Sequence, residues 1–397
     1  MTKNDFFGGR LRSARVFQGL SLQELGDVLS ISRQCVQQFE LNIRRPNEMM
    51  LNALAQALEV QPKFFSVPSN NKITKESCNF GSLKRMSERC RDRVREYGNF
   101  AEALVKSLDA HVGLPTVNFP QIDSIKDFDD VEVATEKCRE RWDLGRNAPI
   151  KNVSRVLERA GAVVTSFKDI SEDIGAFSVD GDVPIIIRNF AKKSKCRMRF
   201  DLAHECGHLV LHNCIETGDG KTEEEARRFA SAFLLPRQAF LEDFRFLEAT
   251  NFGSWSRIYA KISELKIVWG ASNATIIRRA YDLGLIDHIR YRQAYTYIST
   301  NKQREAEDGD ANQKYPELSE IIDLSFQALR DSGRSSPLQL ILDELNITRR
   351  CLEKLIGDVE LRGSDFTQEK LYYASGLDNK IIQFPIKKNY ITLAVRR

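Results

Sequence analysis

The chain has 397 residues, of which 42% are hydrophobic and 29% are charged, and its formal net charge is +4. This length predicts two or three domains with substantial cores, and so small a net charge says little about partners. No apolar run approaches the roughly 20 residues that span a bilayer, so a membrane partner is not expected. The first residues lack the apolar segment of a secretory signal.

Cysteine usage indicates the compartment. The eight cysteines are scattered along the chain, and no two of them form a C-x-x-C pair. Disulfide frameworks are typical of short secreted chains, whereas this chain is long and has no recognisable signal. We therefore expect reduced thiols and a cytoplasmic protein.

Residues 1–68 are predicted to form a small helical domain. Ser21 and Glu24 have the spacing of a capping box, and Ser32 can cap the helix that follows after a short turn. The first helix of this pair should bury three apolar side chains: Leu22, Leu25 and Val28. Two short helices joined by a tight turn predict a helix-turn-helix.

The second helix of the pair should present polar side chains outward. Four of them are candidates for reading base edges in the major groove: Arg33, Gln34, Gln37 and Gln38. Arg and Gln make bidentate hydrogen bonds to guanine and adenine. Three residues after the helix are candidates for phosphate contacts: Asn42, Arg44 and Arg45. The expected partner is a double-stranded DNA operator.

The stretch SLQELGDVLSISRQCVQQFELNIRRPNEMMLNALAQALEV resembles the XRE-type helix-turn-helix domain of phage repressors. The resemblance implies a five-helix domain that binds DNA. Leu22 departs from it, since many relatives have a polar phosphate-binding residue there. Residues 1–68 hold eight basic and six acidic side chains. Because a basic excess normally drives DNA affinity, a module that binds protein instead is the alternative.

Residues 69–130 are predicted to connect this domain to the next. A charge-rich helix is expected over 80–108, and its mixed signs indicate a solvated face. A basic surface for nucleic acid is the alternative. Residues 112–130 contain prolines, a glycine and acids, and they should form a loop.

A second globular unit is expected from residue 131. Its first elements should be two helices followed by three strands: 133–142, 150–160, 162–167, 174–179 and 183–188. Asp180-Gly181-Asp182 is a turn signal, so the last two strands should form a hairpin. An edge strand at this place could hold an extended substrate by main-chain hydrogen bonds.

The motif with the clearest chemistry follows these strands. Residues 204–208 read HECGH, an H-E-x-x-H pattern, and three of the five histidines lie within 204–212. Positions i and i+4 of a helix share a face about 6 Å apart, so His204 and His208 can bind one Zn²⁺. Glu205 can then act as general base on the water at the metal.

A catalytic zinc needs a third protein ligand and one open position. The next predicted helix, residues 222–235, has an apolar stripe that Glu223 extends at its first turn. Glu223 is therefore the candidate third ligand, and Glu225, which lies further round the helix, is the alternative. His212 lies roughly 12 Å along the axis from His204, so either a role behind the ligands or a charge at the helix C-terminus is expected for it.

Small residues near the motif invite two further hypotheses. Gly207 weakens a helix by roughly 1 kcal/mol against Ala, which indicates close approach of another backbone. A thiolate from Cys196 or Cys214 could fill the open zinc position and inhibit the enzyme, although a buried packing role is the alternative. Cys206 lies off the ligand face and should pack.

Several stretches resemble the ImmA/IrrE family of bacterial metallopeptidases: IGAFSVDGDVPIIIRN, RFDLAHECGHLVLH, EEEARRFASAFLLP and LKIVWGASNATIIRRAYDLGLI. The resemblance spans about residues 70–300. It implies that His204, His208 and Glu223 hold the zinc, in agreement with their helical positions. Arg227 departs from it, since relatives commonly have Asn there. Such peptidases typically cleave a helix-turn-helix repressor.

Beyond residue 236 the chain should be mainly helical. Helices are expected at 258–265, 274–283, 287–297, 316–329, 337–345 and 348–356, and strands at 381–384 and 390–395. Residues 301–313 are polar and acidic and should form a linker. The segment after it carries no chemistry that the sequence identifies, and a sensing or dimerising role is open.

The sequence thus predicts an α+β chain of four segments. These are an XRE-type helix-turn-helix DNA-binding domain (1–68), a helical connector (69–130), a zincin-like ImmA/IrrE metallopeptidase domain with a small mixed sheet (131–300) and a mostly helical C-terminal region (301–397). The expected function is transcription regulation by a zinc endopeptidase that cleaves a repressor, its own chain or a partner, on a stress, phage or mobile-element signal. The alternative is a non-enzymatic repressor or antitoxin whose metal domain only senses. A homodimer is compatible with either.

Overall fold

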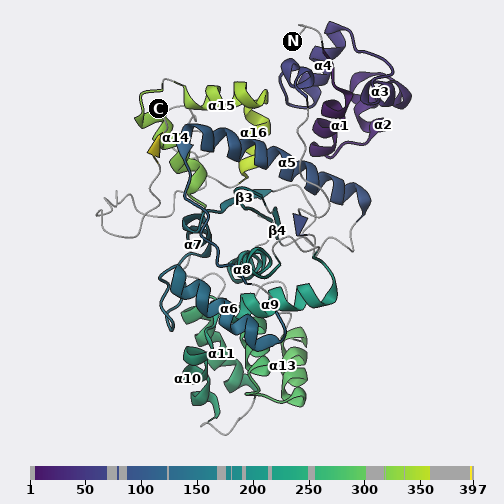
Figure 1. The fold of residues 1–397 in the computed structure, drawn as a ribbon. Helices are drawn as coiled ribbons and strands as arrows, with labels where there is room; N and C mark the ends of the chain where they lie inside the picture. The colour runs from purple at the N-terminus through teal and green to yellow at the C-terminus, as the bar shows by residue number, and fades with distance from the viewer. Residues whose placement is uncertain are drawn as a thin grey trace. The chain divides into compact units, whose positions relative to one another are not determined.

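The structure is a computed structural model. It describes residues 5–68, 78–79, 87–122, 125–167, 176–179, 181–189, 194–212, 217–248, 255–300, 317, 319–334, 336–357 and 394–395. The chain divides into two compact units (Figure 1). One unit comprises Met1–Lys72, Asp92–Thr116 and Glu320–Arg397, and the other comprises Ile73–Arg91 and Val117–Ser319. Each unit is built from separate stretches of chain, unlike the four contiguous segments expected from the sequence.

The N-terminal stretch of the first unit has five helical elements. They are α1 (Gly8–Phe17), α2 (Leu22–Leu29), α3 (Arg33–Glu40), α4 (Glu48–Ala57) and the 3-10 helix η1 (Pro62–Ser66). The capping box of α2 is confirmed, because Ser21 Oγ accepts from Glu24 N and Glu24 Oε2 accepts from Ser21 N. A Cβ on Gly26 would lie 2.7 Å from Ile31 O, so the tight α2–α3 turn requires glycine there.

One expectation for this domain is wrong. Leu25 is buried as predicted, but Val28 is 63% exposed. The α2 helix ends one residue later, at Leu29, and Ser30 turns the chain with a left-handed backbone (φ 55°). Positions three residues apart drift by about 60° round a helix at each step, so Val28 lies about 120° from Leu22 and faces solvent.

Two other stretches of chain complete the first unit. They contain α5 (Glu88–His111), β2 (Val112–Gly113), α14 (Ile321–Asp331), α15 (Pro337–Leu345), α16 (Arg349–Ile356) and β6 (Ala394–Val395). The Phe17 ring of α1 stacks on Phe100 of α5 at 4.3 Å. The Tyr97 hydroxyl donates to Lys354 O at 2.6 Å. The helix-turn-helix therefore shares a core with segments far along the chain.

The second unit contains a mixed sheet. Its strands are β1 (Cys78–Asn79), β3 (Val163–Phe167), β4 (Ala176–Val179) and β5 (Ile185–Asn189), in the order β1-β4-β5-β3. The β4–β5 pair is antiparallel, which confirms the hairpin, and β3 runs parallel to β5. The sequence did not predict β1, which pairs antiparallel with β4.

The other elements of the described part of this unit are helices. They are α6 (Phe128–Arg141), α7 (Val153–Arg159), α8 (Lys195–Leu211), α9 (Gly220–Leu234), α10 (Arg237–Glu248), α11 (Trp255–Trp269), α12 (Asn273–Asp282) and α13 (His288–Thr300). Within this unit α8 lies between the sheet and the α6–α9 layer (Figure 1). Because both of its sides are covered, α8 buries residues all round, including Leu202, Cys206 and Val210.

Some element boundaries differ from the expected ones. The α6 helix begins at Phe128, inside the predicted 112–130 loop, because Asp127 and Asp130 form a capping box there. The α5 helix begins at Glu88 within the described residues, later than position 80. The predicted strand 381–384 lies outside the described residues.

The second unit also extends past the boundary expected at residue 300. Glu317 is buried and accepts hydrogen bonds from Val153 N at 2.7 Å and Ser154 N at 3.0 Å. It also forms a buried ion pair with Arg199 of α8. The polarity of the local sequence does not show that a charged residue is buried in such an ion pair.

Candidate metal centre

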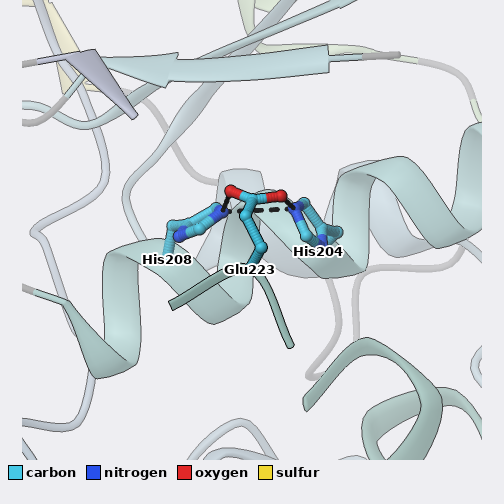
Figure 2. A group of neighbouring side chains, drawn as sticks. All are labelled: His204, His208 and Glu223. Carbon is cyan, nitrogen blue, oxygen red and sulfur yellow. Dashed lines mark hydrogen bonds and ion pairs between the residues drawn. The ribbon is translucent and has the colours of Figure 1, made fainter. Parts of the chain in front are cut away.

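Two helices bring three potential metal ligands together. His204 Nε2 and His208 Nε2 lie 3.1 Å apart on α8. The Glu223 carboxylate on α9 lies between them, with Oε1 3.3 Å from His208 Nε2 and Oε2 3.6 Å from His204 Nε2 (Figure 2). One ligand atom from each residue falls within 4.8 Å of the other two. The structure therefore assembles the predicted set of ligands.

Local sequence explains this placement. His204 and His208 are one turn apart on α8, so their rings share a face. Asp219 caps α9 by accepting from Lys221 N and Thr222 N, which fixes Glu223 in the first turn.

Gly207 lets the two helices approach, as its presence in a helix indicated. A Cβ at Gly207 would lie 3.1 Å from Phe229 Cβ and 3.2 Å from Ala226 Cα of α9. Real Cβ contacts are seldom so short, so a larger residue would push α9 and its Glu223 away from the histidines.

The three residues fit a divalent metal ion. Two imidazole nitrogens and one carboxylate oxygen are the ligand set of a catalytic zinc with one open position. Glu223 Oε1 is buried and accepts no hydrogen bond among the described residues. A buried acceptor of this kind normally has a partner, and a cation at the centre of the three would be one.

The three potential ligands shift one another's pKa values. Burial raises the pKa of Glu223, but the nearby imidazoles of His204 and His208 outweigh this effect, and the pKa is lowered overall. Burial lowers the pKa of His208 to about 4, against the opposing effect of the Glu223 carboxylate. Burial also lowers the pKa of His204, but Glu223 and Glu205 together raise it. An anionic Glu223 and a neutral His208 are the forms that bind a metal.

Glu205 lies next to these ligands and is only 4% exposed. Burial raises its pKa to about 7, against the charge of His204 and a hydrogen bond from Ser178. Ser178 Oγ of β4 donates that bond to Glu205 Oε2 at 2.8 Å. A carboxylate with a pKa near neutrality is suited to accept and return a proton. No sequence pattern pointed to Ser178 beyond its place on a predicted strand.

The alternative third ligand has another partner. Glu225 Oε2 lies 2.9 Å from His212 Nε2. His212 Nδ1 in turn lies 3.0 Å from His208 Nδ1. Glu225 and His212 therefore stand behind the ligands, and neither belongs to the cluster of ligand atoms in the described part of the chain.

Arg227, which departs from the family pattern, lies at the rim of the site. Its Nη2 is 3.8 Å from Glu223 Oε2 and its Nη1 is 3.3 Å from Glu224 Oε2. Its side chain is 52% exposed, so solvent screens its charge. The departure adds a cation near Glu223 without displacing any of the three potential ligands.

The cysteines that the structure describes near the site are not part of the cluster. Cys196 and Cys206 are both buried on α8, which agrees with packing for Cys206. Cys196 is absent from the group of ligand atoms among the described residues. Cys214 lies outside the described residues, so its inhibitory role stays a hypothesis.

The candidate DNA contacts lie on and after α3. Arg33, Gln34 and Gln37 are exposed, and Gln38 is half-buried. Ser32 caps α3 by accepting from Cys35 N at 3.1 Å, which leaves the first turn to present Arg33 and Gln34.

The three candidate phosphate contacts differ from one another. Asn42 adopts a left-handed backbone (φ 57°), and its Oδ1 accepts from Gly8 N at 2.8 Å. Asn42 therefore has a structural role at the start of α1, and only its amide nitrogen is left for a phosphate. Arg44 lies over the Phe39 ring at 5.9 Å, and Arg45 is exposed.

Comparison with known proteins finds a matching family model for each of two parts of the chain. Residues 157–251 match the family model of the IrrE N-terminal-like domain, and residues 11–65 match that of the helix-turn-helix. An uncharacterized HTH-type transcriptional regulator, y4wC, from Sinorhizobium fredii is 33% identical over 69 residues, which are 17% of this chain and 48% of that protein. The chain thus spans about half the length of this curated relative. No solved structure matches the chain.

The chain therefore carries a helix-turn-helix domain of the transcription-regulator type and, further along, an IrrE-like domain of a metallopeptidase family. In the IrrE-like domain the matched residues include all three potential ligands and Glu205. No helix in the described stretches is long and apolar enough to cross a bilayer.

Proposed function

We propose that this protein is a DNA-binding transcription regulator whose zinc-dependent endopeptidase cleaves a helix-turn-helix repressor in response to a stress, phage or mobile-element signal. The observation that carries the proposal is the convergence of His204, His208 and Glu223 beside a buried Glu205. A metal site used only for sensing has no need of a buried carboxylate next to the ligands.

Each residue has a role in this proposal. Zn²⁺ held by His204, His208 and Glu223 would polarise the scissile carbonyl and the attacking water. Glu205 would accept a proton from that water as its oxygen bonds to the carbonyl carbon. Glu205 would then give the proton to the leaving amine nitrogen as the peptide C–N bond breaks. Ser178 would hold the Glu205 carboxyl in place through its 2.8 Å hydrogen bond.

The β1–β4 pairing favours the chain's own connector as one substrate. Asn79 pairs with Ser178, the residue whose hydroxyl contacts Glu205. Extended peptides bind sheet edges by such main-chain pairing, so β1 occupies the place a substrate strand would take. Cleavage near β1 would separate the helix-turn-helix segment from the peptidase segment in sequence. A partner repressor would use the same edge after β1 leaves it.

The Glu205→Gln variant tests the proposal. Zinc-loaded wild-type protein should yield fragments of itself or of an added helix-turn-helix repressor, detected by intact mass spectrometry. Glu205→Gln should bind zinc and DNA like the wild type but yield none, because the amide cannot take up the proton. A wild-type protein that binds zinc, yet leaves itself and each repressor intact, would favour the non-enzymatic regulator.

A further inference from the structure

Behind the candidate metal ligands lies a hydrogen-bonded network of buried side chains that the proposed mechanism does not use. It begins at His208 Nδ1, which faces His212 Nδ1 at 3.0 Å. It continues from His212 Nε2 to Glu225 Oε2 at 2.9 Å. His208 is 1% exposed, His212 4% and Glu225 5%. Water therefore has little access to either hydrogen bond.

The bonding pattern allows one arrangement of protons when a metal is bound. The His208 Nε2 atom faces His204 and Glu223, so its lone pair is the one directed to the metal position. A neutral imidazole with a free Nε2 lone pair carries its proton on Nδ1. His208 Nδ1 must then donate to His212 Nδ1, and His212 Nε2 must donate to the Glu225 carboxylate.

The two histidine ligands differ in this respect. His204 Nδ1 is buried and has no hydrogen-bond partner among the described residues. Only His208 is therefore held from behind in that part of the chain. The far end of the network reaches the surface, where Lys221 Nζ lies 3.7 Å from Glu225 Oε1 with a largely exposed side chain. The Glu225 carboxylate at the end of this network thus faces the ammonium group of Lys221.

We infer that His212 and Glu225 are positioning residues that fix His208 in the tautomer and ring orientation required for metal binding. The inference rests on the proposed metal site and names the part of it that lies beyond the ligands. Metal-bound histidines generally donate their second N–H to an acceptor, and the loss of such an acceptor typically weakens metal affinity by about 10–100-fold. Here a second histidine transmits the bond to a carboxylate on the neighbouring helix.

The experiment measures zinc affinity by competition with a chelator, in the full-length chain and without any peptidase assay. His212→Leu removes the acceptor and should weaken zinc binding by roughly 10–100-fold. His212→Gln keeps a carboxamide oxygen near the His208 Nδ1 proton and should recover much of the loss. Glu224→Gln is the matched control, because Glu224 is next to Glu225 in sequence but pairs with Arg228 and Arg278. Its zinc affinity should equal that of the wild type.

Thermal unfolding of the metal-free variants separates positioning from folding. His212→Leu should unfold cooperatively. If it does not, Glu225→Gln replaces it in the experiment. Its expected loss of zinc affinity is smaller, because the amide oxygen still accepts a hydrogen bond from His212. A folded His212→Leu, or in its place a folded Glu225→Gln, that binds zinc as tightly as the wild type would overturn the inference. A wild-type chain that binds no zinc would instead overturn the proposed function.

Discussion

At the scale of single residues, Glu205 combines a proposed chemical role with an unfavourable environment. Its carboxyl group is buried, and only Ser178 donates a hydrogen bond to it among the contacts described. Burial raises its pKa from 4.5 to about 7, which means that the folded protein binds its proton more tightly than the unfolded chain does. Groups arranged for catalysis are often destabilising in this way.

This predicts a pH-dependent gain in stability for Glu205→Gln without metal. As pH rises from 4.5 to 7, the unfolded wild-type chain loses the Glu205 proton while the folded protein keeps it, so the wild type loses stability. Glutamine does not titrate. The variant should therefore be more stable at pH 8, by up to about 3 kcal/mol, and equal below pH 4.5.

Chemical unfolding in the presence of a chelator, repeated between pH 4.5 and 8, measures this difference. Groups that do not interact with Glu205 titrate alike in both proteins and cancel in the comparison; His204, whose pKa Glu205 helps to raise, is the exception. Equal stability of the two proteins at pH 8 would show that Glu205 is already ionised in the folded state.

At the scale of elements, the site depends on how closely α8 and α9 pack. Gly207 faces Phe229 and Ala226 of α9 at distances shorter than most real Cβ contacts, so a Cβ there would require α9 to move by a few tenths of an ångström. Because Glu223 starts the same helix, a displacement of α9 moves a ligand as well as the core. Gly220, the first residue of α9, has open space around it and serves as a matched position.

We predict that Gly207→Ala lowers the free energy of unfolding by about 1–2 kcal/mol, as overpacking outweighs the gain in helix propensity. Gly220→Ala should leave stability unchanged or slightly higher. Thermal unfolding of both variants checks this, and zinc affinity should fall only in Gly207→Ala. Equal melting temperatures would mean that α9 shifts aside without strain.

The candidate DNA interface is also a property of a single element, the α3 helix. Gln37 is exposed on α3, whereas Gln23 on α2 is also exposed but donates to Asp27 Oδ1 at 2.7 Å. If α3 enters the major groove, Gln37→Ala should lose about 1–3 kcal/mol of discrimination, or roughly 5–150-fold, on a fragment selected from random DNA with the wild-type chain. Gln23→Ala should bind that fragment like the wild type. Identical affinities of both variants would mean that Gln37 does not contact the bases, and a wild-type chain that selects no DNA fragment would favour a protein-binding module.

At the scale of the whole molecule, each unit is assembled from distant stretches of chain. Phe17 of the helix-turn-helix stacks on Phe100, and Gln61 N donates to Asn346 O at 2.8 Å. In the other unit Glu317 binds Arg199 and the start of α7. The helix-turn-helix and the IrrE-like domain are thus each completed by residues outside the stretches that their family models match.

The sequence alone determined those features that depend on neighbours along the chain. Helical spacing placed His204 beside His208, the apolar stripe turned Glu223 inward, and capping residues fixed the start of α2 and α3. Each is a local effect of backbone geometry, with a range of three to four residues along a helix.

Only the tertiary structure decided what depends on contacts between distant residues. It paired Ser178 with Glu205, His212 with Glu225, and β1 with β4, and it left Val28 exposed. Contacts between separate elements produce no regular spacing of residue types along the sequence, so no local pattern reveals them. The cluster of three potential ligands could therefore be predicted from the sequence, but the side chains that contact them and shift their pKa values could not.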